Sequence, residues 1–87
     1  MIACALIMLA LVNHQRVEHH MAPLRRGELK HWHYRGNNFA WGFDNISTAF
    51  EAWMASQGHK ENILDRHYTH TTIVCNDDTY DEEFWGQ

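Results

Sequence analysis

The stretch from Phe50 to Cys75, FEAWMASQGHKENILDRHYTHTTIVC, decides the fold of this chain. Its first part carries apolar residues at helical spacing, which predicts an amphipathic helix. A further helical turn is expected from His59 to Leu64, after Gly58 ends the first helix. The last part is rich in Thr, Ile and Val, which favour a strand from Tyr68 to Cys75. The predicted order is therefore helix, helical turn and strand.

Capping and turn residues on both sides extend this prediction. Thr48, with Glu51 three residues later, matches a capping box at the start of the helix. Residues 76–78 (Asn-Asp-Asp) predict a turn, after which Tyr80–Trp85 is expected to pair with the preceding strand as a hairpin. Before the helix, residues 24–38 are expected to form mainly a loop with a short extended piece at 30–34, and the alternating aromatic residues 39–43 indicate either a short strand or a packed loop.

The N-terminal segment is predicted to be a helix from Ala3 to His20. It has no Gly or Pro, it is rich in strong helix formers, and Pro23 follows it. Residues 1–12 are apolar but lack a basic flank and a small-residue cleavage site, so we favour a buried first helix; an export signal is the alternative. The run is also shorter than the ~20 apolar residues that a membrane-spanning helix needs, so we expect no transmembrane segment.

Three motifs of this chain resemble motifs of the CAP superfamily (SCP-like, cysteine-rich secretory, antigen 5 and pathogenesis-related 1 proteins) in its bacterial form. Trp53–Leu64 is similar to the family's W-[MLI]-x-S-x-G-H-[RK]-x-N-I-L pattern. Asn13–Arg16 is similar to the N-x-x-R of its first helix, and Tyr34–Gly42 to its G-E-N-[IL]-A motif. The resemblance covers about residues 11–75 firmly and the ends loosely.

The resemblance implies one α+β domain over residues 1–87, a truncated CAP-like α-β-α sandwich with helices packed on a small antiparallel sheet. It is abbreviated, because residues 25–33 stand where the family has a helix and a long loop. One face of the sheet would then be thinly covered, and exposed Trp and Phe side chains would favour self-association. Asn13 and Arg16, one helical turn apart, are expected to tie the first helix to the sheet.

The same resemblance implies a cleft with two His and two acidic residues. His67 matches one of these His, and His31 or His33 could replace the other. We assign the acid of G-E-N-[IL]-A to Asn38, which cannot take a proton. The predicted site residues are His67, His31, His33, Asn38 and Tyr68, which follows His67 in the sequence.

Some members of the family bind zinc through the two His of the cleft, so the resemblance implies a weak zinc site at His67 with one of His31 or His33. Imidazole is the commonest metal ligand, but a site needs three or four converging donors. The alternative is that these are surface or structural His whose rings bond backbone groups. No other cofactor is indicated by the sequence.

Charge and cysteine content restrict the partners and the compartment. The net charge of −4 with His neutral argues against generic nucleic-acid binding, which needs a basic patch. Protonation of all eight His would change this charge to +4, so the sign reverses in mild acid. Cys4 and Cys75 could pair only if the first helix lies beside the Cys75 strand; we favour two buried free thiols over this disulfide.

We therefore expect a non-enzymatic binding domain of an extracellular type, with a degenerate His-containing cleft for a small apolar or cell-envelope ligand. Secretion is implied by the resemblance and not by a convincing signal peptide. One alternative is a metal-assisted or acid/base hydrolase that uses the same His. Another is a truncated gene product without independent activity. Asn38 in place of an acid favours binding over hydrolysis, which requires a positioned proton donor or acceptor.

Overall fold

The computed structural model describes residues 2–27 and 33–86, with Ile2 described by its backbone alone. His31, one of the predicted site residues, therefore lies outside the described residues. The elements in chain order are α1 (Ile2–Glu18), β1 (Arg25–Arg26), β2 (Tyr34–Trp41), α2 (Ile46–Ala55), α3 (Gln57–Ile63), β3 (His70–Asn76) and β4 (Thr79–Gly86).

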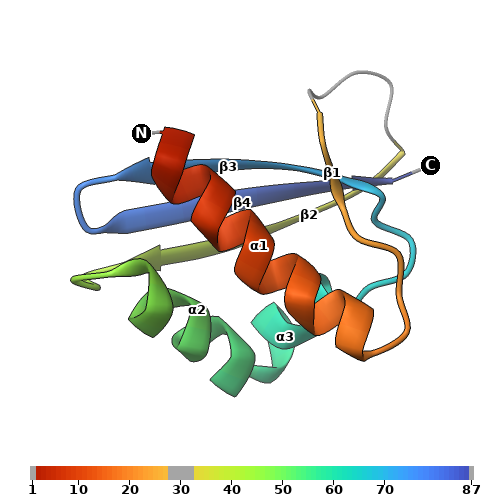
Figure 1. Cartoon of the computed structure of the whole chain (residues 1–87), viewed down its shortest axis with the longest axis horizontal. Coiled ribbons are helices and arrows are strands. Elements are labelled where there is room, and N and C mark those ends of the chain that lie inside the picture. Colours follow the sequence, from red (N-terminus) through yellow and green to blue (C-terminus); the bar gives the residue numbers. More distant parts are fainter. Residues whose placement is uncertain (1, 28–32, 87) are drawn as a thin grey trace.

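The strands form one sheet in the order β1-β3-β4-β2, and α1 crosses in front of it in Figure 1 with α2 and α3 below. β3, β4 and β2 pair antiparallel, as expected. β1 is parallel to β3, so the sheet is mixed and not purely antiparallel. The α+β class is confirmed.

The helix and strand bounds correct several local expectations. α1 agrees with the predicted first helix, and the β3–β4 hairpin agrees with the predicted strands and turn. β2 is longer than expected, because eight residues of β4 pair with the segment predicted as loop. The capping box is wrong: the N-cap is Asn45, whose side chain accepts a hydrogen bond from the Thr48 N–H at 3.0 Å. Gly58 does not end the helix either, because Ser56 has extended backbone there and Gly58 lies within α3.

The core lies between the three helices and one face of the sheet. Val12 and Trp53 from the helices meet Ala40 and Phe84 from the strands, and all four are almost fully buried. Strand residues that face this core alternate with residues that face away from it, as the pleat of a sheet requires. Asn38 and Glu82 are paired across β2 and β4 on the core face, and both are 0% exposed.

Glu82 is a carboxyl group enclosed in this core. One of its oxygens accepts the Thr71 hydroxyl at 2.8 Å, while Oε1 has no hydrogen-bond partner among the described residues. Burial raises the pKa of Glu82 to about 8, against the opposing influences of Thr71 and Arg16. Glu82 is therefore mainly protonated at neutral pH.

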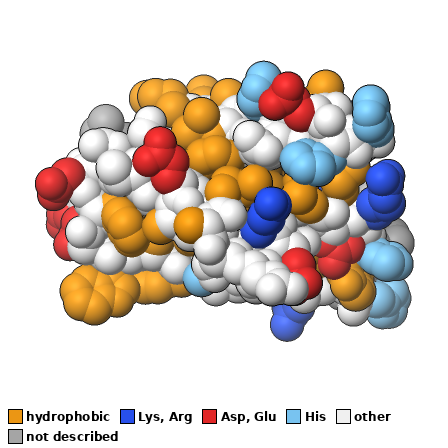
Figure 2. Space-filling model, turned by 90° about the horizontal axis from the view of Figure 1, so that it is seen from below, with side chains coloured by type: hydrophobic (Ala, Val, Ile, Leu, Met, Phe, Trp, Pro, Cys, Tyr) orange, Lys and Arg blue, Asp and Glu red, His pale blue; other side chains and the backbone are white. Residues whose placement is uncertain are grey.

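The other face of the sheet exposes large apolar side chains. Phe39, Trp41 and Val74 keep 47%, 72% and 59% of their surface exposed, and Figure 2 shows hydrophobic side chains projecting from the surface. Within residues 2–27 and 33–86, no helix covers this face, so the second helical layer of the expected sandwich is not among the described elements. Self-association through this face stays a prediction, which sedimentation of the chain beside Trp41→Ala would test.

Cys4 and Cys75 form a disulfide, which corrects the interpretation as free thiols. The pairing is possible because α1 packs along β3 and brings the two Cα atoms to 6.3 Å. The bond closes a loop with a sequence separation of 71, for which chain entropy gives a stabilisation of about 4 kcal/mol. The described helices include none that is long and apolar enough to cross a membrane.

The buried carboxyl of Glu82 predicts a stability that falls as pH rises. Its folded pKa of about 8 lies above its ordinary value of 4.5, so its contribution is complete below about pH 4.5 and is lost as pH rises to about 8. Glu82→Gln keeps the shape without the ionisation. We expect the variant to remove most of the decline in unfolding free energy over this range, measured by urea unfolding at several pH values. A decline of equal size in both chains would contradict the assignment.

Candidate functional site

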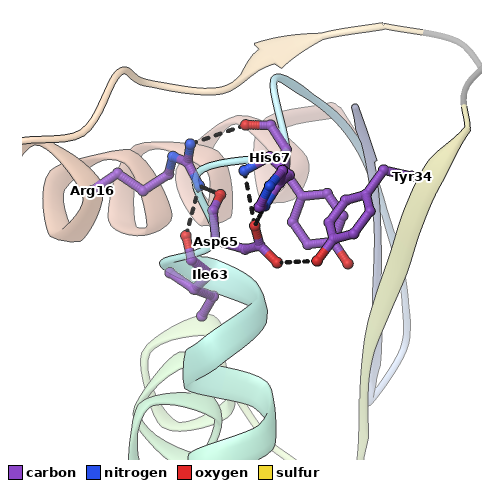
Figure 3. A network of polar contacts seen from close by, with 6 residues as sticks. Arg16, Tyr34, Ile63, Asp65 and His67 are labelled. Atoms are coloured by element: carbon purple, nitrogen blue, oxygen red, sulfur yellow. Dashed lines mark hydrogen bonds and ion pairs between the residues drawn. The ribbon is translucent and has the colours of Figure 1, made fainter. Parts of the chain in front are cut away.

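The site is built on a buried arginine of α1. Arg16 is 2% exposed, and its guanidinium donates to four backbone carbonyls (Figure 3 shows three of them). Nε bonds Ala22 O at 2.9 Å, and the two Nη atoms bond Ile63 O and Asp65 O at 2.9 Å each and Tyr68 O at 3.0 Å. Burial lowers the pKa of Arg16, and the charge of Asp65, joined by that of Glu82 when it is ionised, opposes this effect. The bonds connect α1 to the segment that follows it, at Ala22, and to residues 63–68, which run from the end of α3 towards β3.

Asn13, one turn earlier on α1, holds the segment that leads to β1. Its amide donates to Leu24 O at 3.0 Å and accepts from the Leu24 N–H at 2.7 Å. This pair of bonds satisfies both backbone groups of Leu24 as a neighbouring strand would. Asn13 and Arg16 are therefore structural, as expected, but they tie α1 to residues 22–24 and 63–68 outside the strands and not to the sheet itself.

Asp65 joins this support to the exposed surface. Its Oδ2 accepts the Tyr34 hydroxyl at 2.7 Å, and its Oδ1 accepts the His67 backbone N–H at 2.8 Å and lies 3.0 Å from His67 Nδ1. Partial burial acts to raise the pKa of Asp65, but the bonds from His67 and Tyr34 hold this pKa below its ordinary value. The bond to Asp65 in turn raises the pKa of the Tyr34 hydroxyl. Asp65 is thus an ionised acceptor that fixes two side chains.

The rings around Asp65 form a short aromatic series. The Tyr34 centroid lies 4.8 Å from that of His67 and 5.0 Å from that of Tyr68, which stacks on Phe84 at 5.1 Å. Tyr68 fits because Gly36 has no side chain: a Cβ there would lie 2.0 Å from the Tyr68 hydroxyl. Burial raises the pKa of Tyr68 to about 12, with a smaller effect of the Asp65 charge. Tyr68 is a buried wall, while Tyr34 and His67 are exposed.

The structure brings two of the predicted residues together and separates one. The rings of His67 and Tyr68 both contact the Tyr34 ring. His33 directly precedes Tyr34 in the chain and is exposed. Asn38 is four residues along β2 from Tyr34, which corresponds to about 13 Å at ~3.3 Å per residue. It is buried beneath α3, where it donates to His59 O at 3.0 Å and accepts from Asn62 at 2.9 Å.

The acid position of G-E-N-[IL]-A needs a correction of its own. Aligned without a gap from Gly36 to Ala40, this position falls on Asn37 and not on Asn38. The side-chain amide of Asn37 donates hydrogen bonds to the carboxylates of Asp81 and Glu83 on the neighbouring strand β4. Asn38→Glu would instead place a second carboxyl opposite the buried Glu82.

Sequence reasoning did not identify Asp65 or Tyr34 as partners of His67. A usable signal was present for Asp65, because an Asp two residues before a backbone N–H commonly forms a local turn with it. Tyr34 gave no such signal, since its contact with Asp65 spans 31 residues. His59 was expected to be structural, and its ring bonds the Ser56 hydroxyl at 3.0 Å.

The described part of the chain lacks a cluster of metal-binding side chains. Residues 2–27 and 33–86 include no group of three or more His, Cys, Asp or Glu that could hold a metal ion. His67 with Asp65 supplies two donor side chains, and Asp65 already accepts from Tyr34. Chemically, the arrangement offers an exposed imidazole oriented by a carboxylate, beside an exposed phenol ring.

Comparison with known proteins identifies the fold. An extracellular protein containing an SCP domain from Bacillus anthracis str. Ames superposes with a TM-score of 0.90 at 16% identity, over 98% of this chain and 41% of that one. A cysteine-rich secretory protein from Staphylococcus aureus gives 0.89 at 15% identity, over 98% and 39%. An outer surface protein from Borrelia burgdorferi gives 0.77 at 12% identity, over 93% and 90%.

The chain therefore has the CAP-like, or SCP, fold that its motifs indicate. It spans about two fifths of the length of the first two of these proteins. No family model matches the sequence, and no curated protein matches it. The likeness is thus one of structure at low identity, and it establishes the fold alone.

The four carbonyl bonds of Arg16 predict a large loss of stability in Arg16→Lys. Lysine keeps the charge but cannot reach four separated carbonyls, and each buried acceptor left unpaired costs about 1–3 kcal/mol. We expect a loss of about 3 kcal/mol or more in urea unfolding with the disulfide intact. Arg66→Lys, at an exposed position, is the matched control and should change stability by about 0.5 kcal/mol or less. A similar small change in Arg16→Lys would refute the role.

Proposed function

We propose that this chain is a non-enzymatic binding domain of an extracellular type whose ligand contacts His67 and Tyr34. The observation that carries the proposal is the double attachment of Asp65 to the Tyr34 hydroxyl and the His67 ring. It holds two exposed rings in one arrangement before a ligand arrives. Side chains that are already ordered lose less conformational entropy on binding, which favours affinity.

The exposed groups favour a ligand with an apolar face and polar edges. Tyr34 keeps 38% of its surface exposed, and the His67 side chain keeps 70%. Their rings offer apolar contact, and the outer nitrogen of His67 and the edge of Tyr34 offer hydrogen bonding. A small apolar or cell-envelope ligand, such as a peptidoglycan fragment, combines these two properties. His33, which is exposed next to Tyr34, would extend the site.

Two observations support an extracellular location. The Cys4–Cys75 disulfide is typical of a protein from an oxidising compartment. Structural neighbours include proteins described as extracellular and as an outer surface protein. Both are consistent with a ligand that is met outside the cytoplasm.

A second candidate is acid/base hydrolysis by His67, either alone or with zinc held by His67, His31 and His33. It is favoured by the 3.0 Å approach of Asp65 Oδ1 to His67 Nδ1, since a carboxylate at this nitrogen orients an imidazole for proton transfer. The binding function is preferred for two reasons. The Asp65 carboxylate is shared, because it also accepts from Tyr34. Several side chains that could act as nucleophiles are engaged elsewhere, because the Ser56 hydroxyl bonds the His59 ring and both cysteines are joined in the disulfide.

The binding proposal predicts that soluble peptidoglycan fragments shift the NMR signals of Tyr34 and His67. Tyr34→Ala removes the ring and should weaken binding about tenfold, which corresponds to ~1.4 kcal/mol. Trp41→Ala is the matched control, because it removes an exposed aromatic ring from the other face of the sheet. Equal weakening in both variants, or no shift at Tyr34 and His67, would contradict the proposal and favour a chain without independent activity.

The same chain distinguishes the second candidate. A ligand that binds only the folded state raises the melting temperature, so zinc should raise it if His67 holds the metal. This rise should disappear in His67→Ala and persist in His14→Ala, an exposed His of α1. Zinc stabilisation that depends on His67, together with hydrolysis of the added fragments, would replace the binding function with the metal-assisted one.

A further inference from the structure

A basic pocket is lined in part by Tyr68, whose ring also contacts the Tyr34 ring. It has a volume of about 680 Å³ and lies between the segment after α1 and the segment that enters β3. Its lining includes the cations Arg16, Arg25 and Arg66, the imidazole of His70, and the apolar residues Met21 and Pro23. Among the described residues that line it, none is Asp or Glu. The protein as a whole carries a net charge of −4, so this concentration of cations is local.

The walls of the pocket are held by backbone and buried contacts. Arg25 and His70 are direct neighbours in the β1–β3 pairing, and the Arg25 N–H bonds Thr69 O at 2.9 Å. On the other wall, the Met21 N–H bonds Arg16 O at 2.9 Å, and Arg16 Nε bonds Ala22 O. The cations therefore project from segments whose positions are fixed by the fold.

Arg16, which lines this pocket, has one N–H group left over from its carbonyl bonds. A guanidinium has five N–H groups, and four of those of Arg16 bond the carbonyls of Ala22, Ile63, Asp65 and Tyr68. Nη2 makes a single bond, to Tyr68 O, so one of its N–H groups has no partner among the described residues. The side chain is 2% exposed and lines the pocket. A buried cation bonded only to neutral carbonyls still lacks a direct anionic partner.

We propose that this pocket binds a small organic anion that carries a short apolar chain. A carboxylate or phosphate group would lie among Arg25, Arg66 and His70, close to the unused N–H of Arg16. Such groups form charge-assisted hydrogen bonds with arginine, which are about twice as strong as neutral ones. The apolar chain would contact Met21 and Pro23, as in small-ligand sites that combine an apolar lining with a few polar groups.

This site is distinct from the one at His67 and Tyr34. Tyr68 lines the pocket, and its ring contacts Tyr34 at 5.0 Å, so the two sites share a wall. The carboxylate of Asp65 faces Tyr34 and His67 and is not part of the pocket lining. Either site can exist without the other, and separate signals report on each.

The test titrates octanoate, octyl phosphate and octanol into the disulfide-bonded chain and follows the backbone amides by NMR. We expect one or both anions to shift the amides of residues 21–25 and 66–70 together with the Arg16 Nε–H. Octanol should shift them much less. Arg66→Gln should weaken anion binding about threefold or more, and a double change with Arg25→Gln about tenfold or more. Added salt should weaken binding further.

Arg26→Gln is the matched control, because Arg26 follows Arg25 on β1, is exposed, and does not line this pocket. It should leave the affinity within about twofold of the parent chain. The proposal is overturned if octanol shifts the same amides as strongly, if Arg26→Gln weakens binding as much as Arg66→Gln, or if none of the three compounds shifts these segments. Tyr34→Ala should leave anion binding intact, so failure of the His67 site and failure of this pocket are separately visible.

Discussion

The fold depends on the enclosure of the Arg16 guanidinium by backbone carbonyls. A buried charge is costly unless its donors are satisfied, and here four carbonyls from two loops satisfy most of them. The loops are the segment between α1 and β1 and the segment that runs from the end of α3 to β3, which are about forty-five residues apart in sequence. Asp65 O also accepts the Tyr68 N–H at 3.3 Å. One side chain thus bonds these carbonyls as a neighbouring strand does elsewhere.

The same constraint connects the support with the surface that we propose to bind ligands. Asp65 bonds Arg16 through its backbone oxygen, and its carboxylate bonds Tyr34 and His67. One residue is therefore held from the interior and holds two exposed rings. Arg16 and Tyr68 also line the basic pocket. Both proposed sites are consequently placed by one buried group, and changes to it would disturb them together.

Local sequence patterns predict the features of the fold that depend on residues close together in the sequence. The first helix, the β3–β4 hairpin and the roles of Asn13 and Arg16 follow from local spacing and motifs. Local patterns predict mostly loop for β2, because Tyr34–Trp41 becomes a strand only through its pairing with β4, some forty-five residues later. The disulfide and the Tyr34–Asp65 hydrogen bond are not predictable from local patterns for the same reason, because each joins segments that are distant in the sequence. His67 could be named as a site residue, but its neighbours could not, and no local rule places Glu82 inside the core.

The link between Cys4 and Cys75 has a consequence for the covalent identity of the molecule. It makes nearly all of the chain, with all three helices and most of the sheet, a closed covalent ring. A protease that cuts one peptide bond inside this ring opens it without releasing a fragment, and the non-covalent contacts across the sheet and around Arg16 still hold the pieces in place. A singly cleaved molecule would thus keep its mass, apart from one added water, until a reductant separates the two parts.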